Sequence, residues 1–274
     1  MSDVKEAAAV KNIRVRSMSR HLIIIIMTAA ICISGYNLWK MSERYVQEAQ
    51  VKNSVAKYRP SYYLNALNDS ESSKTAEITE VKSETQNNQF IIDLQNEINK
   101  DIVGWITIPN TNIDYPFVQS YDNSYYLRRD LYGNYALAGS IFMDYRCSKD
   151  FKDFNTIIYG HNMKNSSMFG NLTLFADDGF FDANRTGRIF LEKGTYILEF
   201  FAYMIVNSDD KIIYSNTPAN MDEFFEYVKK NADNYKEFKI NENYTDNINV
   251  VTLSTCSYNF NGARSVLLAT IHPK

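Results

Sequence analysis

Few residues in this chain could carry out covalent chemistry, and one of them is a cysteine near the C-terminal end. The sequence contains three Cys and three His among its 274 residues. Cys256 closes the run Thr-Leu-Ser-Thr-Cys, and Arg264 follows in the same region. A thiolate is a strong nucleophile, and a neighbouring guanidinium favours it because Arg keeps its positive charge at every working pH. Cys256 and Arg264 are therefore candidates for nucleophilic catalysis.

Local sequence patterns predict that these two side chains lie opposite each other. Residues 249–254 and 265–271 are rich in β-branched and aliphatic residues, which is typical of strands. Between them, the Asn-Gly dipeptide at 261–262 favours a tight turn. A hairpin built in this way places Cys256 across from Arg264, with Cβ atoms about 5 Å apart.

A histidine could complete such a site, and His161 is the candidate that the sequence favours. It follows a predicted buried strand at residues 155–159, and Gly160 between them allows a close approach of the backbone. His272 is the alternative in the same part of the chain, but it lies beside Pro273 at the C-terminal end. We therefore expect His161 to face the same cleft as Cys256.

The remaining inventory argues against several kinds of site. No Cys-x-x-Cys or His-x-x-x-His spacing occurs, so the sequence predicts neither a metal site nor a cofactor. A net charge of -3 and a pI near 5.7 argue against nucleic-acid binding, which needs clustered Lys and Arg. Cys147, in the run Tyr-Arg-Cys-Ser-Lys, is expected in a polar loop without a catalytic role.

An apolar segment at residues 22–39 predicts a membrane-spanning helix. It holds no charged residue, and at about 1.5 Å per residue it nearly crosses a hydrocarbon core of about 30 Å. Basic residues dominate the preceding residues 1–21, so the positive-inside rule places that end in the cytoplasm and the rest of the chain outside. A cleaved signal peptide is the alternative, but no clear small-x-small pattern follows the apolar run. The sequence therefore predicts a single-pass signal anchor in the cell membrane.

Two further regions separate this anchor from the predicted folded domain. Residues 41–58 show helical spacing and many good helix formers, which predicts a stalk helix. Residues 65–88 are rich in Ser, Glu, Thr and Asn with few large apolar side chains, which predicts a flexible spacer. We assign residues 40–89 to this stalk and spacer, and residues 90–274 to a catalytic domain that opens with a helix.

The catalytic domain is predicted to be mainly β with helices. Short β-branched or aromatic runs, bounded by Gly, Asn, Asp or Pro, predict its strands. These runs occupy residues 105–108, 155–159, 188–191, 196–206, 249–254 and 265–271. Their number predicts a closed or sandwiched sheet, and we expect a mixed β-barrel decorated by helices. One clear helix lies between the late strands, with Asn220 as its N-cap and an apolar stripe that ends at Tyr235.

Several runs together resemble a known family. Tyr-Gly-His-Asn at 159–162, the Thr-Leu-x-Thr-Cys run that ends at Cys256 and the later Arg264 resemble sortases. The runs that look like class B sortases in particular are Val-Gly-Trp-Ile-Thr-Ile-Pro at 103–109, Asp-Asn-Ser-Tyr-Tyr-Leu at 122–127 and Gly-Ser-Ile-Phe-Met-Asp-Tyr-Arg at 139–146. The likeness extends over roughly residues 90–271.

The resemblance implies a sortase-type closed β-barrel in which Cys256, His161 and Arg264 form the catalytic site. The residues that it implies for the substrate groove are Asn123, Leu127, Ser254 and Thr255. Such an enzyme is a membrane-anchored cysteine transpeptidase that cleaves a C-terminal sorting signal after Thr through a Cys thioester. It then joins the exported protein to an amine of a peptidoglycan precursor or cross-bridge.

Two alternatives remain open at the level of the sequence. A pilin-polymerising sortase would use a Lys of another pilin as the acceptor, and such enzymes usually carry a second, C-terminal membrane helix. A non-enzymatic exported β domain would instead join Cys147 and Cys256 in a structural disulfide. Free thiols at both positions would favour the enzyme, and a disulfide between them would favour the non-enzymatic β domain.

Overall fold

The computed structural model describes residues 2–60, 88–237 and 248–274 of the chain. These residues divide into two compact units, one that ends at Gln47 and one that runs from Glu48 to Lys274. Almost all of the spacer predicted at residues 65–88 lies outside the described residues.

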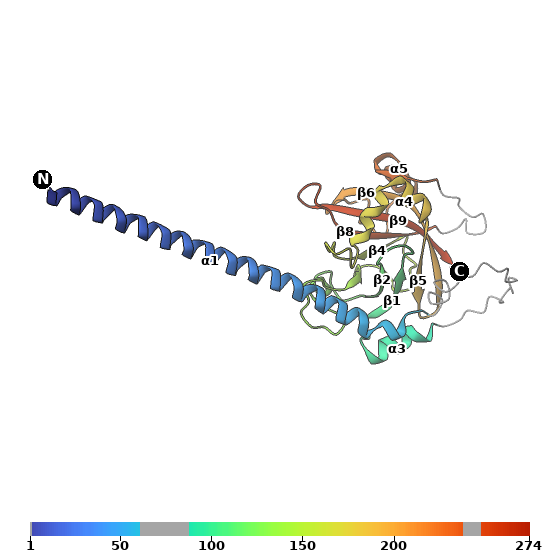
Figure 1. Cartoon of the computed structure of the whole chain (residues 1–274). Helices are drawn as coiled ribbons and strands as arrows, with labels where there is room; N and C mark the ends of the chain where they lie inside the picture. The colour runs from blue at the N-terminus through green and yellow to red at the C-terminus, as the bar shows by residue number, and fades with distance from the viewer. Residues whose placement is uncertain (1, 61–87, 238–247) are drawn as a thin grey trace, which may run out of the picture. The chain divides into compact units, whose positions relative to one another are not determined.

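The first unit is the N-terminal part of α1 (Ser2–Ser54), which is a continuous helix (Figure 1). Among the described residues, the span His21–Tyr58 is the one helical stretch that is long and apolar enough to cross a membrane, with a mean hydropathy of 1.9. It includes the apolar segment at residues 22–39, whose side chains are exposed. The length and composition of this helix therefore fit the predicted membrane span.

The end of α1 belongs to the second unit. The stalk helix predicted at residues 41–58 is α-helical to Ser54 and continues as the 3-10 helix η1 (Ala56–Tyr58). Val55 and Tyr58 are buried in a cluster with residues of α3 (Gln89–Glu97) and β1 (Ile102–Thr107). The Tyr58 hydroxyl also donates a hydrogen bond to Glu97 at 2.5 Å. The last turns of the predicted stalk thus pack as part of the folded unit.

The second unit is built on one closed sheet. After β1, its strands are β2 (Asp114–Val118), β3 (Ile141–Met143), β4 (Asn155–Tyr159), β5 (Thr186–Leu191), β6 (Gly194–Asn207), β7 (Asn234–Tyr235), β8 (Asn249–Cys256) and β9 (Ala263–Pro273). They pair in the order β5-β1-β2-β3-β4-β8-β9-β6, and a β5–β6 pairing closes the ring, while β7 pairs with β6 alone. The predicted closed β-barrel is confirmed.

Two parallel pairings interrupt an otherwise antiparallel barrel, and one of them matters for function. The pairs β2–β3 and β4–β8 run parallel, whereas β8–β9 is an antiparallel hairpin. Because parallel strands end at the same edge of a sheet, the residues that follow β4 and β8 are brought together. His161 follows β4, and Cys256 is the last residue of β8.

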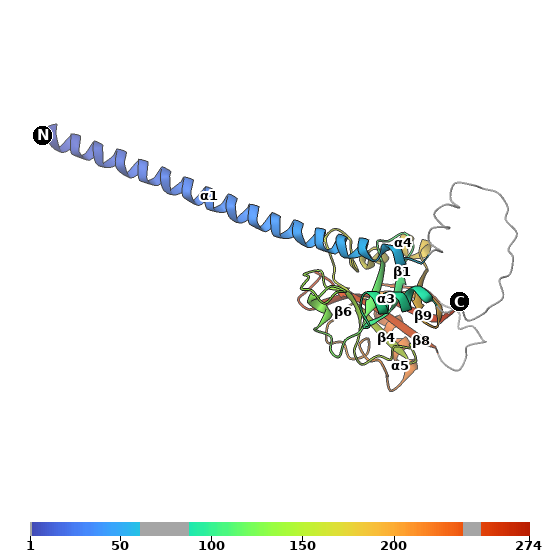
Figure 2. The ribbon, with the colours of Figure 1, turned by 90° about the horizontal axis from the view of Figure 1, so that it is seen from below.

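Helices decorate the barrel as predicted. α3 lies beside β1 (Figure 2). The shorter elements are η3 (Tyr126–Arg128), η4 (Gly170–Ala176) and α4 (Asp178–Ala183). α5 (Met221–Asn231) lies between β6 and β8 in the chain, and the Asn220 side chain caps it by accepting hydrogen bonds from two backbone amides.

The helix α5 ends earlier than the sequence pattern predicts. Its C-cap Ala232 has an extended backbone with a ψ of 137°, so the helix stops there. Tyr235, expected at the end of the helix, lies instead in β7 opposite Ala202 of β6. The pairing of β7 with β6 replaces the final helical turn, because sheet hydrogen bonds satisfy the same backbone groups.

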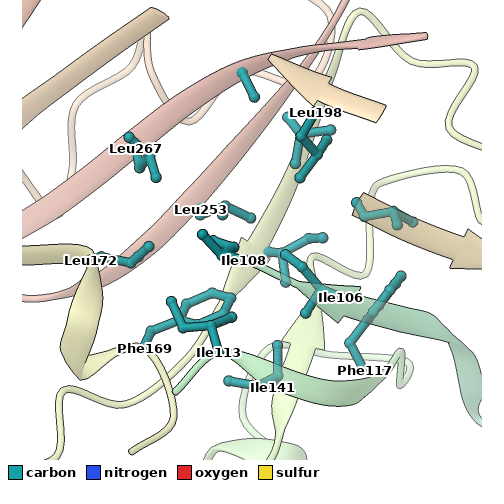
Figure 3. Packing of buried hydrophobic residues seen from close by; sticks show 14 of the residues in the cluster. Ile106, Ile108, Ile113, Phe117, Ile141, Phe169, Leu172, Leu198, Leu253 and Leu267 are labelled. Atoms are coloured by element: carbon teal, nitrogen blue, oxygen red, sulfur yellow. The ribbon is translucent and has the colours of Figure 1, made fainter. Parts of the chain in front are cut away.

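The alternating side chains of the strands pack into separate clusters on the two faces of the sheet. Val251 and Leu253 of β8 belong to the largest buried cluster, whereas Val250 packs in a separate cluster with Phe224 and Val228 of α5. Figure 3 shows part of the largest cluster, where Ile106, Phe117, Leu253 and Leu267 converge from β1, β2, β8 and β9. Successive side chains on a strand point to opposite faces, so β8 contributes side chains both to the barrel interior and to the outer surface on which α5 packs.

Candidate active site

Cys256 and Arg264 form a directly opposed pair at the open end of the β8–β9 hairpin. The register places Cys256 of β8 across from Arg264 of β9, which confirms the opposition predicted from the sequence. Gly262 adopts a φ of +84°, a value that favours glycine, and the Ser257 amide donates to the Ala263 carbonyl at 2.9 Å to close the loop. Both members of the pair are half-buried.

The guanidinium of Arg264 is available to a ligand. Its Nη1 donates to the carbonyl of Ala263 at 3.0 Å, and no described carboxylate forms an ion pair with it. A guanidinium has five N–H donors, so most of them remain free beside the thiol. This is the arrangement that stabilising a developing oxyanion would need.

His161 reaches the same edge of the barrel through the parallel pairing of β4 with β8. Tyr159 pairs with Ser254, and the amide of Gly160 donates to the Ser254 carbonyl at 3.1 Å. A Cβ at position 160 would lie 2.5 Å from Ile141 and 2.7 Å from Phe169, both of them buried. The glycine is therefore required for the tight passage from β4 to His161.

A backbone carbonyl orients the His161 ring. His161 Nε2 lies 2.8 Å from the Leu127 carbonyl oxygen. Because a carbonyl can only accept, Nε2 must carry the proton, which leaves Nδ1 of the neutral ring with a free lone pair. Burial lowers the pKa of His161 below its usual value of 6.5, with Arg128 acting in the same direction and the Leu127 carbonyl opposing it. The imidazole is therefore mainly neutral at pH 7.

One cavity of about 240 Å³ collects the residues that the sequence named for the site. Its lining comes from four barrel strands, the loop after β4, the η3 region and the connection after β6. The lining residues are Asn123, Leu127, Phe142, Tyr159, Gly160, His161, Ser208, Tyr214, Ser254, Thr255, Cys256 and Arg264. All three predicted catalytic residues and all four predicted groove residues are among them.

Asn123 is held by a buried carboxylate behind the cavity. Its Nδ2 donates to Asp144 at 2.9 Å, and its Oδ1 accepts from the Tyr145 amide at 3.0 Å. One Nδ2 hydrogen therefore remains for a ligand. Burial acts to raise the pKa of the fully enclosed Asp144, but hydrogen bonds from Arg146, Asn123 and Tyr159 outweigh it and hold that pKa below the usual value.

The other predicted groove residues contribute different atoms. Leu127 is 41% exposed and offers an apolar side chain to the cavity, while its carbonyl oxygen accepts the hydrogen bond from His161 Nε2. Ser254 shares a strand face with Cys256, since side chains two apart point the same way. The hydroxyl of Thr255 is buried and has no hydrogen-bond partner among the described residues, so other atoms of Thr255 border the cavity.

Two tyrosines of the lining were not among the predicted site residues. The Tyr214 hydroxyl lies 2.9 Å from Ser254 Oγ, and burial raises the pKa of Tyr214 to about 12. The rings of Tyr214 and Tyr159 stack with centroids 6.2 Å apart. Tyr159 carried a signal, because it immediately precedes the Gly-His pair. Tyr214 lies in an irregular connection after β6, and no local pattern marked it.

The two cysteines of the folded unit are both free, so the Cys147–Cys256 disulfide of the non-enzymatic alternative is absent. Cys147 lies in the loop between β3 and β4, as predicted, but its side chain is only 5% exposed and packs in the barrel core. Its Sγ accepts a hydrogen bond from the Ile157 amide at 3.5 Å, and burial raises its pKa to about 12. A buried, protonated thiol of this kind is unreactive.

The remaining titratable groups offer no second centre within the part of the chain that the structure describes. His272 lies in β9 opposite Ile197 and is not part of the cavity lining. In the described ranges, no group of three His, Cys, Asp or Glu side chains could hold a metal ion. Within that part of the chain, Cys256, His161 and Arg264 therefore remain the candidates for the chemistry of the cavity.

A free thiol, a neutral imidazole and an unpaired guanidinium around one cavity are the groups that a cysteine-dependent acyl-transfer enzyme needs. Comparisons with known proteins agree. No protein-family model matches the chain. The chain is 41% identical to Sortase B of Listeria monocytogenes over 189 residues, which cover 67% of this chain and 72% of the relative. It is 28% identical to Sortase B of Staphylococcus aureus over 259 residues, covering 93% and 98% of the two chains.

A solved structure supports the same assignment. A class B sortase of Streptococcus pyogenes involved in pilus biogenesis superposes with a TM-score of 0.60 and 30% identity, over 66% of this chain and 97% of that one. The protein belongs to the class B sortases and is a cysteine transpeptidase. The family resemblance and the barrel predicted from the sequence are both confirmed.

Proposed function

We propose that the protein cleaves a C-terminal sorting signal after a Thr residue and transfers the exported protein to a cell-wall amine. The observation that carries this proposal is the cavity in which Cys256 lies opposite Arg264 and which His161 also lines. Membership of the sortase family supports the reaction class.

In the first step, Nδ1 of neutral His161 takes the thiol proton and the Cys256 sulfur attacks the Thr carbonyl carbon. The carbonyl oxygen gains negative charge, which the free N–H groups of Arg264 stabilise; one such donor can contribute about 3 kcal/mol. The tetrahedral intermediate collapses as the C–N bond breaks and imidazolium gives its proton to the leaving amine. The products are a thioester on Cys256 and a released C-terminal peptide.

In the second step, an amine attacks the thioester carbonyl and the Cys256 sulfur leaves. His161 accepts the proton of the amine and returns one to the thiolate, which restores the starting state. The groove residues Asn123, Leu127 and Ser254 would hold the peptide next to the thiol through one free amide hydrogen, an apolar side chain and a hydroxyl. The substrate and the acceptor amine are thus the only reactants.

The proposed location follows from the N-terminal helix. Residues 22–39 would anchor the protein in the cell membrane as a single pass, with residues 1–21 in the cytoplasm and the catalytic unit outside. A membrane-tethered substrate and a lipid-linked acceptor would then meet the enzyme at one membrane face. Confinement to that face raises the effective concentration of both reactants.

The Streptococcus pyogenes relative, described as acting in pilus biogenesis, suggests a second candidate acceptor. In that case the attacking amine would be a Lys side chain of another pilin. Parallel transfer assays with a peptide amine that mimics a cross-bridge and with a Lys-containing protein fragment distinguish the two acceptors. The amine that gives the faster transfer identifies the product.

The central test uses the full-length chain in detergent micelles and a set of internally quenched peptides, each with one Thr at varied positions. We expect cleavage after Thr, and with hydroxylamine present we expect a hydroxamate at the new C-terminus, which mass spectrometry detects. Replacing Cys256→Ala should abolish both products, whereas Cys32→Ser in the apolar segment should retain them. Cleavage by the Cys256→Ala variant would refute the proposal.

A further inference from the structure

The end of β8 is held by an interaction that the sheet itself does not supply. In the parallel β4–β8 ladder, the amide of Gly160 donates to the Ser254 carbonyl at 3.1 Å. Hydrogen bonds in such a ladder recur every two residues on both strands. The next one would join the amide of Asn162 to the carbonyl of Cys256.

The backbone of Asn162 does not make that bond, because the chain has already left β4. Asn162 forms an isolated antiparallel bridge with Met168. Its side chain takes over the missing position, and Asn162 Nδ2 donates to the Cys256 carbonyl at 2.8 Å across 94 residues of sequence. The side-chain carboxamide of Asn162 thus extends the ladder by one hydrogen bond, although the backbone at His161 is no longer part of the strand.

The loop that carries Asn162 has a fixed shape. The Phe169 amide donates to the His161 carbonyl at 3.0 Å, so the loop closes directly behind the imidazole. Met168 adopts a φ of 54°, and its amide donates to the Tyr115 hydroxyl of β2 at 3.1 Å. The Asn162 side chain therefore joins a constrained loop, anchored to the barrel wall, to the residue that bears the thiol.

We propose that Asn162 is a positioning residue that sets the distance between the Cys256 thiol and the His161 imidazole. This inference rests on the proposed function, in which Nδ1 of His161 exchanges a proton with Cys256. Cys256 is the last residue of its strand, so without the Asn162 amide its carbonyl loses a partner and the strand end can shift. A displacement of about 1 Å at reacting groups can lower a rate by about a hundredfold.

The test compares Asn162→Ala and the isosteric Asn162→Asp, which lacks the donor, with Asn165→Ala in the same loop. Asn165 is the matched control because it accepts hydrogen bonds from Ser167 within the loop and does not reach Cys256. All are assayed as full-length chain with the quenched Thr peptide that the wild type cleaves best and with hydroxylamine as acceptor. We expect kcat to fall about tenfold or more in both Asn162 variants with KM within twofold, because orientation and not binding is lost.

Three controls make the result decisive. The wild type must turn over and Cys256→Ala must not; failure of this condition refutes the proposed function and not the role of Asn162. Circular dichroism and thermal melting show whether the Asn162→Ala variant is misfolded, or folded with a misplaced catalytic residue. Asn162→Asp, which keeps the side-chain volume, gives a second value of kcat for the loss of the donor. A kcat within twofold of wild type in a folded Asn162 variant, or an equal loss in Asn165→Ala, would overturn the inference.

Discussion

Replacing Asp144→Asn tests whether the buried carboxylate behind the cavity supports both the fold and the groove. Asp144 is fully enclosed and accepts hydrogen bonds from Asn123, Tyr159 and three donors of Arg146. The amide keeps the shape but removes the charge, and its NH2 group then faces donors. Breaking a buried ion pair costs about 3–5 kcal/mol, and Arg146 is 40% exposed and can regain water. We therefore expect a loss of about 3 kcal/mol in the free energy of unfolding.

The pH dependence of this loss has a defined sign. The folded-state pKa of Asp144 is lowered, so its stabilising contribution is present above the unfolded pKa and disappears as the pH falls through the folded one. The stability difference between the wild type and the variant should therefore be full at pH 7 and narrow below about pH 4. Urea unfolding of the full-length chain in micelles at several pH values measures it.

The same substitution should also weaken peptide binding, because Asn123 loses the acceptor that orients it. We expect KM to rise about three- to tenfold, which corresponds to about one hydrogen bond. The matched control is Asp150→Asn, which removes an exposed carboxylate paired with Lys152 and should change neither property measurably. A destabilisation of Asp144→Asn below about 1 kcal/mol at pH 7 would show that the buried network contributes little.

Two further predictions concern His161. Gly160→Ala should lower the free energy of unfolding by about 1–3 kcal/mol and impair turnover, because its Cβ would clash with Ile141 and Phe169. An unchanged melting temperature and an unchanged kcat/KM would contradict the close packing of Gly160 against these two side chains. The acidic limb of the kcat/KM profile should have its midpoint below pH 6.5, since burial lowers the pKa of His161 and the reaction begins with the neutral ring. A midpoint above pH 7 in a series of buffers of equal ionic strength would exclude that starting state.

Parts of the fold governed by short-range rules could be predicted from the sequence. The Asn-Gly dipeptide lies in the connection at residues 257–262 between two β-branched runs, so the hairpin that opposes Cys256 and Arg264 could be predicted from local sequence. The Asn220 cap of α5 and the apolar helix near the N-terminus are equally local signals. Their interactions form within a few residues and need no knowledge of distant partners.

Elsewhere, distant partners overruled the local pattern. The polar neighbours of Cys147 predicted a polar loop, and the residue lies in one, but its thiol is buried against the barrel core and accepts a hydrogen bond from the Ile157 amide. The apolar stripe of α5 reached Tyr235, but pairing with Ala202 drew that residue into β7. Both deviations arise because a closed sheet offers burial and backbone partners that a sequence window does not contain.

The sequence by itself determined which groups are available for chemistry: a Cys and an Arg across one hairpin and a His after a strand. The tertiary structure alone decided that β4 runs parallel to β8, which brings His161 to Cys256 from 95 positions away in the chain. It also supplied the Leu127 carbonyl that orients the imidazole, the Tyr214 hydroxyl beside Ser254 Oγ and the Asn162 amide at the end of β8. Parallel pairing has no sequence signature of its own, because its partners are joined by long connections and chosen by packing.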